Sequence, residues 1–283
     1  MVYKKSYYEL YGYTQRAGRF AALQPHRKTI IDTMRRSHEA NSRTLAAVQA
    51  AFATLGLPYD CLYRGDLTSV AGYDVVLSVG GDGTFLEIAR HALDTPVLGV
   101  NSDPERSTAF FCAANSTTIQ AYLEALLAGT IRIVPLTRLQ VSINQHPLPY
   151  YALNDLLVAH VNPAAMTSYT LRVGEHSEAQ RSSGIWIATA AGSTAAIRAA
   201  GGGILPLRSR KLQYLIREPY IGDRGGFHLL KGAVAAGKSL EITSKTRRGR
   251  LFMDGPHLRF SLGLGDILTV TTAATPLRVL GLD

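Results

Sequence analysis

The strongest structural signal in this sequence is Val75-Val76-Leu77-Ser78-Val79-Gly80-Gly81-Asp82-Gly83-Thr84-Phe85-Leu86-Glu87. Its first part is apolar and rich in β-branched residues, which predicts a buried strand. The strand ends at Gly80 and Gly81, where the backbone needs a freedom that residues with a Cβ lack. From Thr84 onward apolar residues recur at helical spacing, so we expect a helix to begin there. A strand, a glycine turn and a helix N-terminus together favour anion binding, because amide N–H groups converge and the helix dipole attracts negative charge.

Asp82 places a carboxylate inside this predicted anion site. Such a group is unfavourable there unless it binds a metal, takes a proton or accepts hydrogen bonds. The alternative is a structural one: Asp is favoured at helix starts, and Asp-Gly is an ordinary turn signal. Because the five residues 80–84 occur in a strand-to-helix context, the pattern favours a functional role over a simple cap.

The overall composition is that of an ordinary soluble globular protein. The chain has 283 residues, of which 46% are hydrophobic and 18% charged, so it can form one or two domains with a large core. Two cysteines are too few for a disulfide framework and fit a reducing compartment. The sequence shows no secretory signal, membrane-spanning apolar run or peroxisomal tripeptide. We therefore expect a cytoplasmic protein that does not bind membranes.

The formal net charge of +9 indicates acidic partners or ligands. Basic residues cluster at 16–43, 208–217 and 245–250. Nucleic acid binding is one interpretation, but no aromatic-interleaved basic motif or helix-turn-helix pattern accompanies the charge. The same electrostatic field attracts small polyphosphates, and a basic solvated surface accounts for most of these residues individually. We expect small-molecule nucleotides as ligands and no nucleic acid partner.

The first half of the chain predicts alternating helices and strands. A helical pattern covers 30–55, a short strand fits 59–63, and a second buried strand fits 97–100. With the central strand and helix these give a βαβ unit and hence a parallel sheet. Residues 101–107 follow the second buried strand at its carboxyl end, where open α/β sheets bind ligands. A further helix is predicted at about 117–127.

The hydrophobic pattern of the sequence changes after Gly129. Period-two alternation, as in 139–143 and 240–244, is separated by Gly, Pro and Asn turns. This pattern indicates a mostly antiparallel β domain, so we place a domain boundary near residue 130.

Two polar constellations lie in this β-rich half. Asn154-Asp155 places an amide and a carboxylate beside a strand, where they can bind ribose hydroxyls; a polar turn is an equally good explanation. In 183–196 a strand leads into a turn of small residues with hydroxyls at Ser193 and Thr194. Small residues let a ligand approach the backbone, although tight helix–strand packing selects them as well.

Gly232-Ala233-Val234-Ala235-Ala236-Gly237-Lys238-Ser239 matches the P-loop pattern. A P-loop needs a helix after its Lys-Ser pair, whereas residues 240–244 alternate like a strand. We interpret the segment as a hairpin turn and the match as chance.

Four motifs occur in a fixed order: Gly80-Gly81-Asp82-Gly83-Thr84, Asn154-Asp155, Gly192-Ser193-Thr194-Ala195 and Asp254-Gly255. Together they resemble the NAD kinase family, over most of the chain from about Ile30 to the C-terminus. The first motif alone also occurs in diacylglycerol, sphingosine and phosphofructo-kinases. The resemblance implies an α/β N-terminal domain with a parallel sheet (1–129) and a β-rich, dinucleotide-binding C-terminal domain (130–267). It also implies that the tail, about 268–283, returns to the first domain.

The resemblance further implies Mg²⁺-dependent transfer of the ATP γ-phosphate to the 2′-hydroxyl of the adenosine ribose of NAD or NADH. Asp82 matches the catalytic Asp of the family, and no metal ligand is assigned. The nucleotide-binding positions it implies are Gly81, Gly83, Thr84, Asn154, Asp155, Arg181, Ser183, Thr189, Ser193, Thr194, Ala195 and Asp254. We expect a homodimer or a higher homo-oligomer.

The sequence departs from the usual family pattern in ways that point to a subgroup. Ser183 stands where typical members carry Asp, and Ala196 stands where they carry Tyr. The segments 181–184 and 189–196 are similar to the plant NADH-preferring branch, and 101–107 is similar to the divergent animal mitochondrial members. A lipid or sugar kinase with the same glycine turn, or a basic nucleic-acid-binding protein, remains the alternative.

Overall fold

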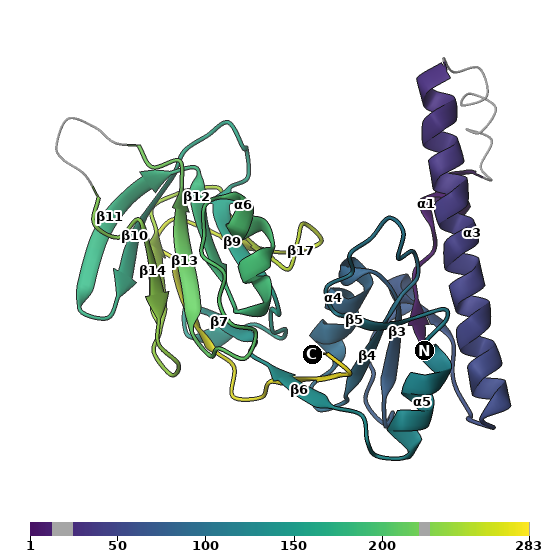
Figure 1. The fold of residues 1–283 in the computed structure, drawn as a ribbon. Coiled ribbons are helices and arrows are strands. Elements are labelled where there is room, and N and C mark those ends of the chain that lie inside the picture. The colour runs from purple at the N-terminus through teal and green to yellow at the C-terminus, as the bar shows by residue number, and fades with distance from the viewer. Residues whose placement is uncertain (13–24, 221–226, 283) are drawn as a thin grey trace. The chain divides into compact units, whose positions relative to one another are not determined.

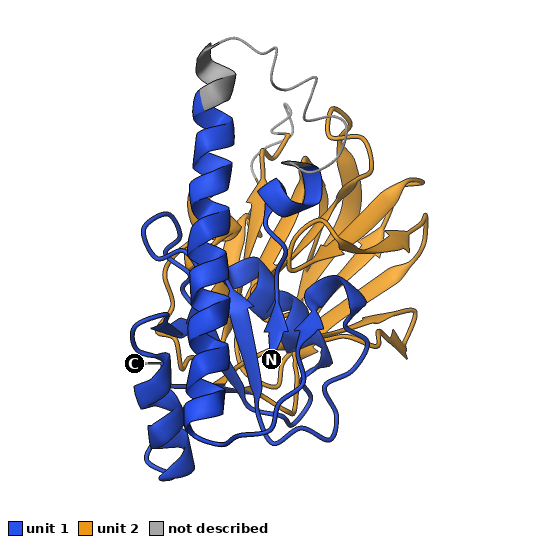
Figure 2. Cartoon of the chain, turned by 90° about the vertical axis from the view of Figure 1, so that its right-hand side faces the viewer, with its two compact units in different colours: residues 1–134, 278–283 blue, residues 135–277 orange. Residues whose placement is uncertain are grey.

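The computed structural model describes residues 1–12, 25–220 and 227–282 (Figure 1). The chain divides into two compact units, Met1–Val134 with Arg278–Asp283, and Pro135–Leu277 (Figure 2). The first unit extends to Val134, five positions beyond residue 129, where we expected the first domain to end. Residues 268–277, which we expected to return to the first domain, belong to the second unit. The segment that returns to the sheet of the first unit is β19 (Leu277–Leu280), whose Val279 pairs with Val97.

The first unit is an α/β unit built on a largely parallel sheet. In the described residues the strand order is β2-β1-β3-β4-β19-β6, with β5 also paired to β4. The strands are β1 (Val2–Tyr3), β2 (Leu62–Tyr63), β3 (Val76–Gly80), β4 (Val97–Asn101), β5 (Cys112–Asn115), β6 (Ile133–Leu136) and β19 (Leu277–Leu280). The pairs β1–β2, β1–β3, β3–β4, β4–β5 and β4–β19 are parallel, which confirms the parallel sheet.

Three helices of the first unit, those at 25–54, 82–91 and 119–127, agree with the predicted pattern apart from their ends, and the helix at 7–12 was not predicted. They are α1 (Tyr7–Gly12), α3 (Pro25–Thr54), α4 (Asp82–His91) and α5 (Ile119–Leu127), with the short 3₁₀ helix η1 (Arg64–Asp66) after β2. Helix α3 begins earlier than expected, and α4 begins at Asp82 instead of Thr84. The predicted strand at 59–63 is reduced to its last two residues.

The core of this unit follows from strand alternation. Successive residues of a strand face opposite sides of the sheet. Leu77 and Val79 of β3 pack in one apolar cluster with Val48 and Phe52 of α3 and with Leu123 of α5. The even-numbered residues of β3 therefore face the other side.

The second unit consists of two antiparallel sheets. In the described residues their orders are β11-β10-β15-β18-β7-β8 and β14-β13-β12-β9-β16-β17. The strands of the first are β7 (Leu139–Ile143), β8 (His146–Pro147), β10 (Thr167–Val173), β11 (His176–Ser182), β15 (Leu240–Ser244) and β18 (Ile267–Thr272). Those of the second are β9 (Asp155–His160), β12 (Gly184–Ala188), β13 (Leu212–Arg217), β14 (Lys231–Val234), β16 (Gly249–Met253) and β17 (Leu258–Leu262). One apolar cluster draws residues from both sheets, which confirms the predicted β-rich domain.

Two short helical segments, η2 (Ala191–Thr194) and α6 (Ala196–Ala199), follow β12. The predicted turn of small residues after this strand is therefore present. The α-helix that follows the turn, α6, is a single turn long.

The segment that resembles a P-loop is followed by a strand, as predicted, but it is not a hairpin turn. Strand β14 pairs with β13 in one sheet, whereas β15 pairs with β10 and β18 in the other. The segment connects the two sheets of the unit. None of the described helices is both long and apolar enough to cross a membrane.

Candidate active site

The glycine turn after β3 is shaped by close packing between the strand end and the first turn of α4. The carbonyl of Gly81 accepts the amide N–H groups of Thr84 at 2.9 Å and Phe85 at 3.2 Å. Thr84 is fully buried, and a Cβ added at Gly80 would stand 2.3 Å from its Oγ1 atom. Gly80 is thus required because the Thr84 side chain fills the space where its own side chain would lie. Thr84 has a packing role in the turn, whatever else it contacts.

The Asp82 carboxylate holds the loop that precedes β5. One oxygen accepts the amide N–H of Phe110 at 3.1 Å and the other accepts that of Phe111 at 3.0 Å. Ala109, just before these donors, has a φ of 43°, a left-handed conformation that side chains rarely adopt. Gly81 is the N-cap residue of α4, and no side chain caps this helix end. The capping alternative for Asp82 is therefore wrong.

The loop after β4 lies beside this turn, as the parallel sheet predicts. The amide of Ser102 donates to the carbonyl of Gly80 at 2.9 Å, and a Cβ at Gly81 would stand 3.2 Å from Ser107 Oγ. Within the loop, Arg106 forms an ion pair with the buried Asp103 at 3.0 Å. Residues 80–84 and 101–107 therefore form one site at the carboxyl edge of the sheet.

Asp254 organises the site residues of the second unit. It is buried, with a φ of 47°, and its carboxylate accepts the amides of Leu153 at 2.8 Å, Asn154 at 2.7 Å and Asp155 at 3.1 Å. A carboxylate that accepts three N–H groups is well satisfied by the protein itself. The geometry supports a positioning role for Asp254, as the residue that fixes the Asn154-Asp155 loop.

Asp155 is buried beside this second carboxylate. Burial and, to a smaller extent, the negative charge of Asp254 raise its pKa to about 7. The neighbouring Asn154 has a buried Oδ1 atom that accepts no hydrogen bond within the described part of the chain. This loop therefore combines a carboxyl group that titrates near neutrality with an amide oxygen that lacks a partner.

The turn after β12 packs directly on the same loop. Thr189 donates its amide to the carbonyl of Asn154 at 2.9 Å and its hydroxyl to the carbonyl of Leu153 at 2.5 Å. A Cβ at Gly192 would lie 2.0 Å from the Asn154 carbonyl oxygen, so only glycine fits there. The structure thus brings together three predicted motifs: Asn154-Asp155, the turn at 189–195, and Asp254.

The hydroxyl groups in this turn have different environments. Ser193 is fully buried; its hydroxyl donates to the carbonyl of Ala190 at 2.6 Å and accepts the amide of Leu205 at 3.0 Å. Thr194 is exposed, and Ala195 is half-buried. Ser193 stabilises the turn, whereas Thr194 is accessible to a ligand.

Arg181 and Ser183 are not brought to this cluster. Ala188, at the end of β12, pairs with Asp155, but Gly184 begins the strand at its opposite end. Four residue steps along a strand span about 13 Å. The Arg181 guanidinium lies over the Tyr220 ring, 5.1 Å from its centroid. A part of the second unit other than the Asn154-Asp155 loop therefore holds these two residues.

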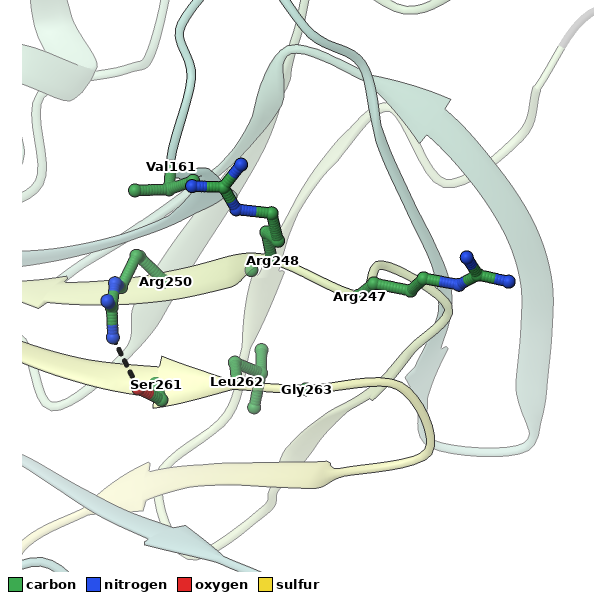
Figure 3. A pocket seen from close by; sticks show the side chains of 8 residues that line it. Val161, Arg247, Arg248, Arg250, Ser261, Leu262 and Gly263 are labelled. Carbon is green, nitrogen blue, oxygen red and sulfur yellow. Dashed lines mark hydrogen bonds between the residues drawn. The ribbon is translucent and has the colours of Figure 1, made fainter.

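A basic pocket lies at the start of β16, at the end of this strand remote from Asp254 (Figure 3). Its volume is about 180 Å³, and its lining includes Arg247, Arg248 and Arg250. Figure 3 shows the Arg250 guanidinium bonded to the Ser261 hydroxyl, with Arg247 directed away from the other two arginines. The basic cluster at 245–250 in the sequence corresponds to this pocket, but the pocket contains none of the predicted site residues.

Some features of the site leave no sequence signal. The donors to Asp82 are backbone amides, and any residue type at positions 110 and 111 except proline provides them. The described residues contain no group of three or more His, Cys, Asp or Glu that could hold a metal ion.

Comparison with known proteins places these observations in context. Residues 25–131 match the family model "ATP-NAD kinase N-terminal domain". The chain is 36% identical over 264 residues to a probable NADH kinase of Oryza sativa subsp. japonica, covering 85% of this chain and 81% of the relative. It is 34% identical over 241 residues to an NADH kinase of Arabidopsis thaliana, covering 76% and 75%.

The fold is similar to that of an NAD kinase from Archaeoglobus fulgidus solved in complex with ATP. The TM-score is 0.69 at 22% identity, and the match covers 83% of this chain and 88% of that one. Yeast NADH kinase, solved with NADH, matches with a TM-score of 0.66 at 19% identity, covering 78% of this chain and 65% of that one. At these identities the two structures support the fold.

Proposed function

The chain belongs to the NAD kinase family, and from that premise we propose that it transfers the γ-phosphate of ATP to the 2′-hydroxyl of the adenosine ribose of NAD or NADH. The product would be NADP or NADPH. The two plant relatives carry the name NADH kinase, which supports NADH as an accepted substrate.

The observation that carries the proposal is the position of Asp82 at the first residue of α4, directly after the glycine turn. Two backbone amides orient its carboxylate, one on each oxygen. Each carboxylate oxygen has a further lone pair and can still accept a proton. We propose that Asp82 is the general base that removes the proton of the ribose hydroxyl. A positioned base of this kind contributes on the order of 10²–10⁴-fold to the rate.

The glycine turn would bind phosphate. Gly81 and Gly83 leave the backbone accessible at the N-terminus of α4, and Gly83 is exposed. Amide groups at a helix N-terminus favour anions. Phosphoryl transfer requires mainly positioning and charge neutralisation, which this part of the first unit can supply.

The second unit would hold the dinucleotide. Asn154 and Asp155 supply an amide oxygen and a carboxyl group suited to ribose hydroxyls, and Thr194 supplies an exposed hydroxyl. We propose that Asp254, Thr189 and Ser193 position these groups, since their own polar atoms are used by backbone partners. Arg181 and Ser183 remain proposed nucleotide contacts; their position at the other end of β12 supports contact with a part of the ligand other than the one at Asn154.

We propose Mg²⁺ or another divalent cation as the cofactor. Mg²⁺ usually binds one or two carboxylates together with substrate phosphates, so the lack of a three-carboxylate cluster in the described residues is compatible with it. Asp82 is the carboxylate at the glycine turn that would contribute to holding it. The bound ion would neutralise phosphate charge. A cytoplasmic location and a homo-oligomeric state remain proposals, which cell fractionation and light scattering would test.

A coupled assay with ATP, Mg²⁺ and either NAD or NADH, measuring NADP(H), tests the proposal. We expect product with both dinucleotides and kcat/KM for NADH at least equal to that for NAD. Phosphorylation of a lipid or sugar acceptor, without NADP(H) formation, would instead support the alternative kinase. Salt-sensitive RNA binding that persists in Asp82→Asn, without kinase activity, would support a nucleic-acid-binding protein.

A further inference from the structure

Two cationic residues directly follow β1 and β2, the two strands beside β3 in the sheet order. Tyr63, Tyr3 and Val79 pair in register across β2, β1 and β3. The next residue after Tyr3 is Lys4, in line with Gly80, and the next after Tyr63 is Arg64, which begins the 3₁₀ helix η1. Neighbouring strands are about 4.8 Å apart, so Lys4 is one strand and Arg64 two strands from the turn.

The direction of the Lys4 side chain follows from the same register. Its amide donates to the carbonyl of Val79 at 3.3 Å, so the parallel pairing with β3 continues to this residue. Residues in register on adjacent strands face the same side, and Lys4 therefore shares a side with Gly80. That is the side on which the Thr84 side chain packs, since a Cβ at Gly80 would meet it. Lys5 has the opposite direction, and its ammonium lies over the Tyr63 ring, 4.4 Å from the centroid.

Arg64 reaches the same turn from η1, the 3₁₀ helix that follows β2. Its guanidinium donates to Thr84 Oγ1 at 3.4 Å and lies 3.7 Å from the position of a Cβ at Gly83. Gly83 is in the first turn of α4, next to Asp82. Arg64 therefore lies against the exposed edge of the predicted phosphate site.

The Lys4 ammonium is half-buried and lacks an ion pair of its own. Among residues 1–12, 25–220 and 227–282, no carboxylate lies within ion-pair distance of it, and the nearby Asp103 is paired with Arg106. Burial lowers the pKa of Lys4; the Asp103 charge raises it, and the like charge of Arg64 lowers it. Lys4 and Arg64 are thus two like charges near the turn, and the carboxylate that acts on Lys4, that of Asp103, is already paired with Arg106.

The Cys112 thiol is influenced by both the Lys4 ammonium and the carboxylate of the proposed base, Asp82. Burial and, to a smaller extent, the Asp82 carboxylate raise the pKa of this thiol to about 12, while the Lys4 ammonium acts to lower it. Lys4 and Asp82 therefore both act on Cys112, a half-buried residue at the start of β5.

We infer that Lys4 and Arg64 form a polyphosphate subsite that holds the triphosphate of ATP at the glycine turn. The inference rests on the proposed kinase function for the identity of the ligand. The mutual repulsion of two partly desolvated cations is relieved when a polyanion binds between them. Hydrogen bonds between charged partners are also the stronger ones.

The test compares Lys4→Met with the matched control Lys5→Met, because both remove one lysine charge and the two side chains face opposite sides. Binding of ATP, of inorganic tripolyphosphate and of NADH is measured by calorimetry and by the ligand-induced rise in Tm. We expect the affinity of Lys4→Met for ATP and tripolyphosphate to fall about 10- to 100-fold. NADH affinity should change less than about twofold, and Lys5→Met should match the wild type. Arg64→Met should behave like Lys4→Met.

The stability of the ligand-free protein separates this role from a structural one. If Lys4 binds phosphate, the Tm of Lys4→Met without ligand is equal to or above that of the wild type, because a partly buried charge, which lies near the like charge of Arg64, is removed. An unchanged tripolyphosphate affinity, whether or not Tm falls, would overturn the inference, and so would a loss confined to NADH. Tripolyphosphate binding does not depend on turnover. A wild-type protein that binds it through Lys4 but makes no NADP(H) would therefore refute the proposed function alone.

Discussion

Each unit of this molecule contains an Asp-Gly pair whose carboxylate accepts backbone amide N–H groups from a distant loop. The two aspartates differ in burial and in how many amides their oxygens accept. Asp82 is half-buried and accepts two amides, one on each oxygen. Asp254 is buried and accepts three, and its charge also acts on Asp155. The first retains capacity for a proton at an accessible turn, whereas the second is occupied by the protein. The same dipeptide thus contains our proposed base in one unit and fixes a loop in the other.

The largest expected effect tests the first half of this comparison. Asp82→Asn should lower kcat by about 10²-fold or more, because an amide cannot act as a carboxylate base. Its NH₂ group would also face one of the two amides at 110 and 111, so we expect a stability loss of about 1–2 kcal/mol. NADH affinity should be retained, because the second unit is proposed to bind it. Thermal unfolding, NADH titration and turnover on one preparation measure all three quantities. A variant that keeps more than a tenth of the activity would leave Asp82 with a structural role alone.

Asp254→Asn should reverse this pattern. One oxygen cannot replace two, and the new NH₂ group would face amide donors in a buried place, which costs on the order of 2–5 kcal/mol. We expect a lower denaturant midpoint and weaker NADH binding. Asp82→Asn is the matched control, since it makes the same chemical change at a carboxylate that is less buried. Equal stability losses in the two variants would contradict the distinction between them.

The sequence predicts the structural surroundings of Asp82 but not those of Asp254. Strand, glycine turn and helix around Asp82 have separate local signals, so the fold of this region and the candidate base both follow from residues 75–87. Nothing near Asp254 in the sequence indicates that its partners are the amides of 153–155, about a hundred positions away. Long-range backbone acceptors depend on tertiary packing, and any residue type at the donor position suffices.

The same limit explains the wrong predictions. The turn at 232–239 is a local pattern, but whether β14 and β15 pair with each other is decided by the sheets on either side, and they do not. The cation Lys4 lies outside every recognised motif because β1 joins the sheet from the far N-terminus. Propensity and spacing therefore predict elements and single-loop sites, whereas groups that meet through sheet order require the structure.

A smaller effect concerns the pH dependence of the second unit. Burial raises the pKa of Asp155 to about 7 in the folded protein, from an ordinary value of 3.8. If the ionised carboxylate binds ribose hydroxyls, KM for NADH should fall about tenfold as the pH rises from about 6 to about 8. Asp155→Asn should remove this dependence.

The stability consequence of Asp155 has the opposite direction. A carboxyl group with a raised folded-state pKa favours the fold when protonated. Its contribution is complete below about pH 3.8 and is lost as the pH rises through about 7. Urea unfolding of wild type and Asp155→Asn across this range measures it. A pH-independent difference between the two would show that Asp155 does not titrate there.

The smallest expected effect is that of Lys238→Ala. This substitution tests whether the segment 232–239, which matches the P-loop pattern but lacks the following helix, has any function. Lys238 follows Gly237 in the segment that matches a P-loop, and both residues are exposed. Gly237 has a φ of 76°, and the amide of Lys238 donates to the carbonyl of Ala235 at 3.1 Å, so the segment is an ordinary tight turn. No helix N-terminus directs amides toward the lysine, because β15 begins immediately after Ser239. Lys238→Ala should therefore keep kcat and KM for ATP within about threefold of wild type, less than the loss of about 10- to 100-fold in ATP affinity expected for Lys4→Met. If Lys238→Ala weakens ATP binding as much as Lys4→Met does, the triphosphate is held in the second unit. The proposal that the unit of Asp82 binds phosphate while the unit of Asp254 binds the dinucleotide would then be wrong.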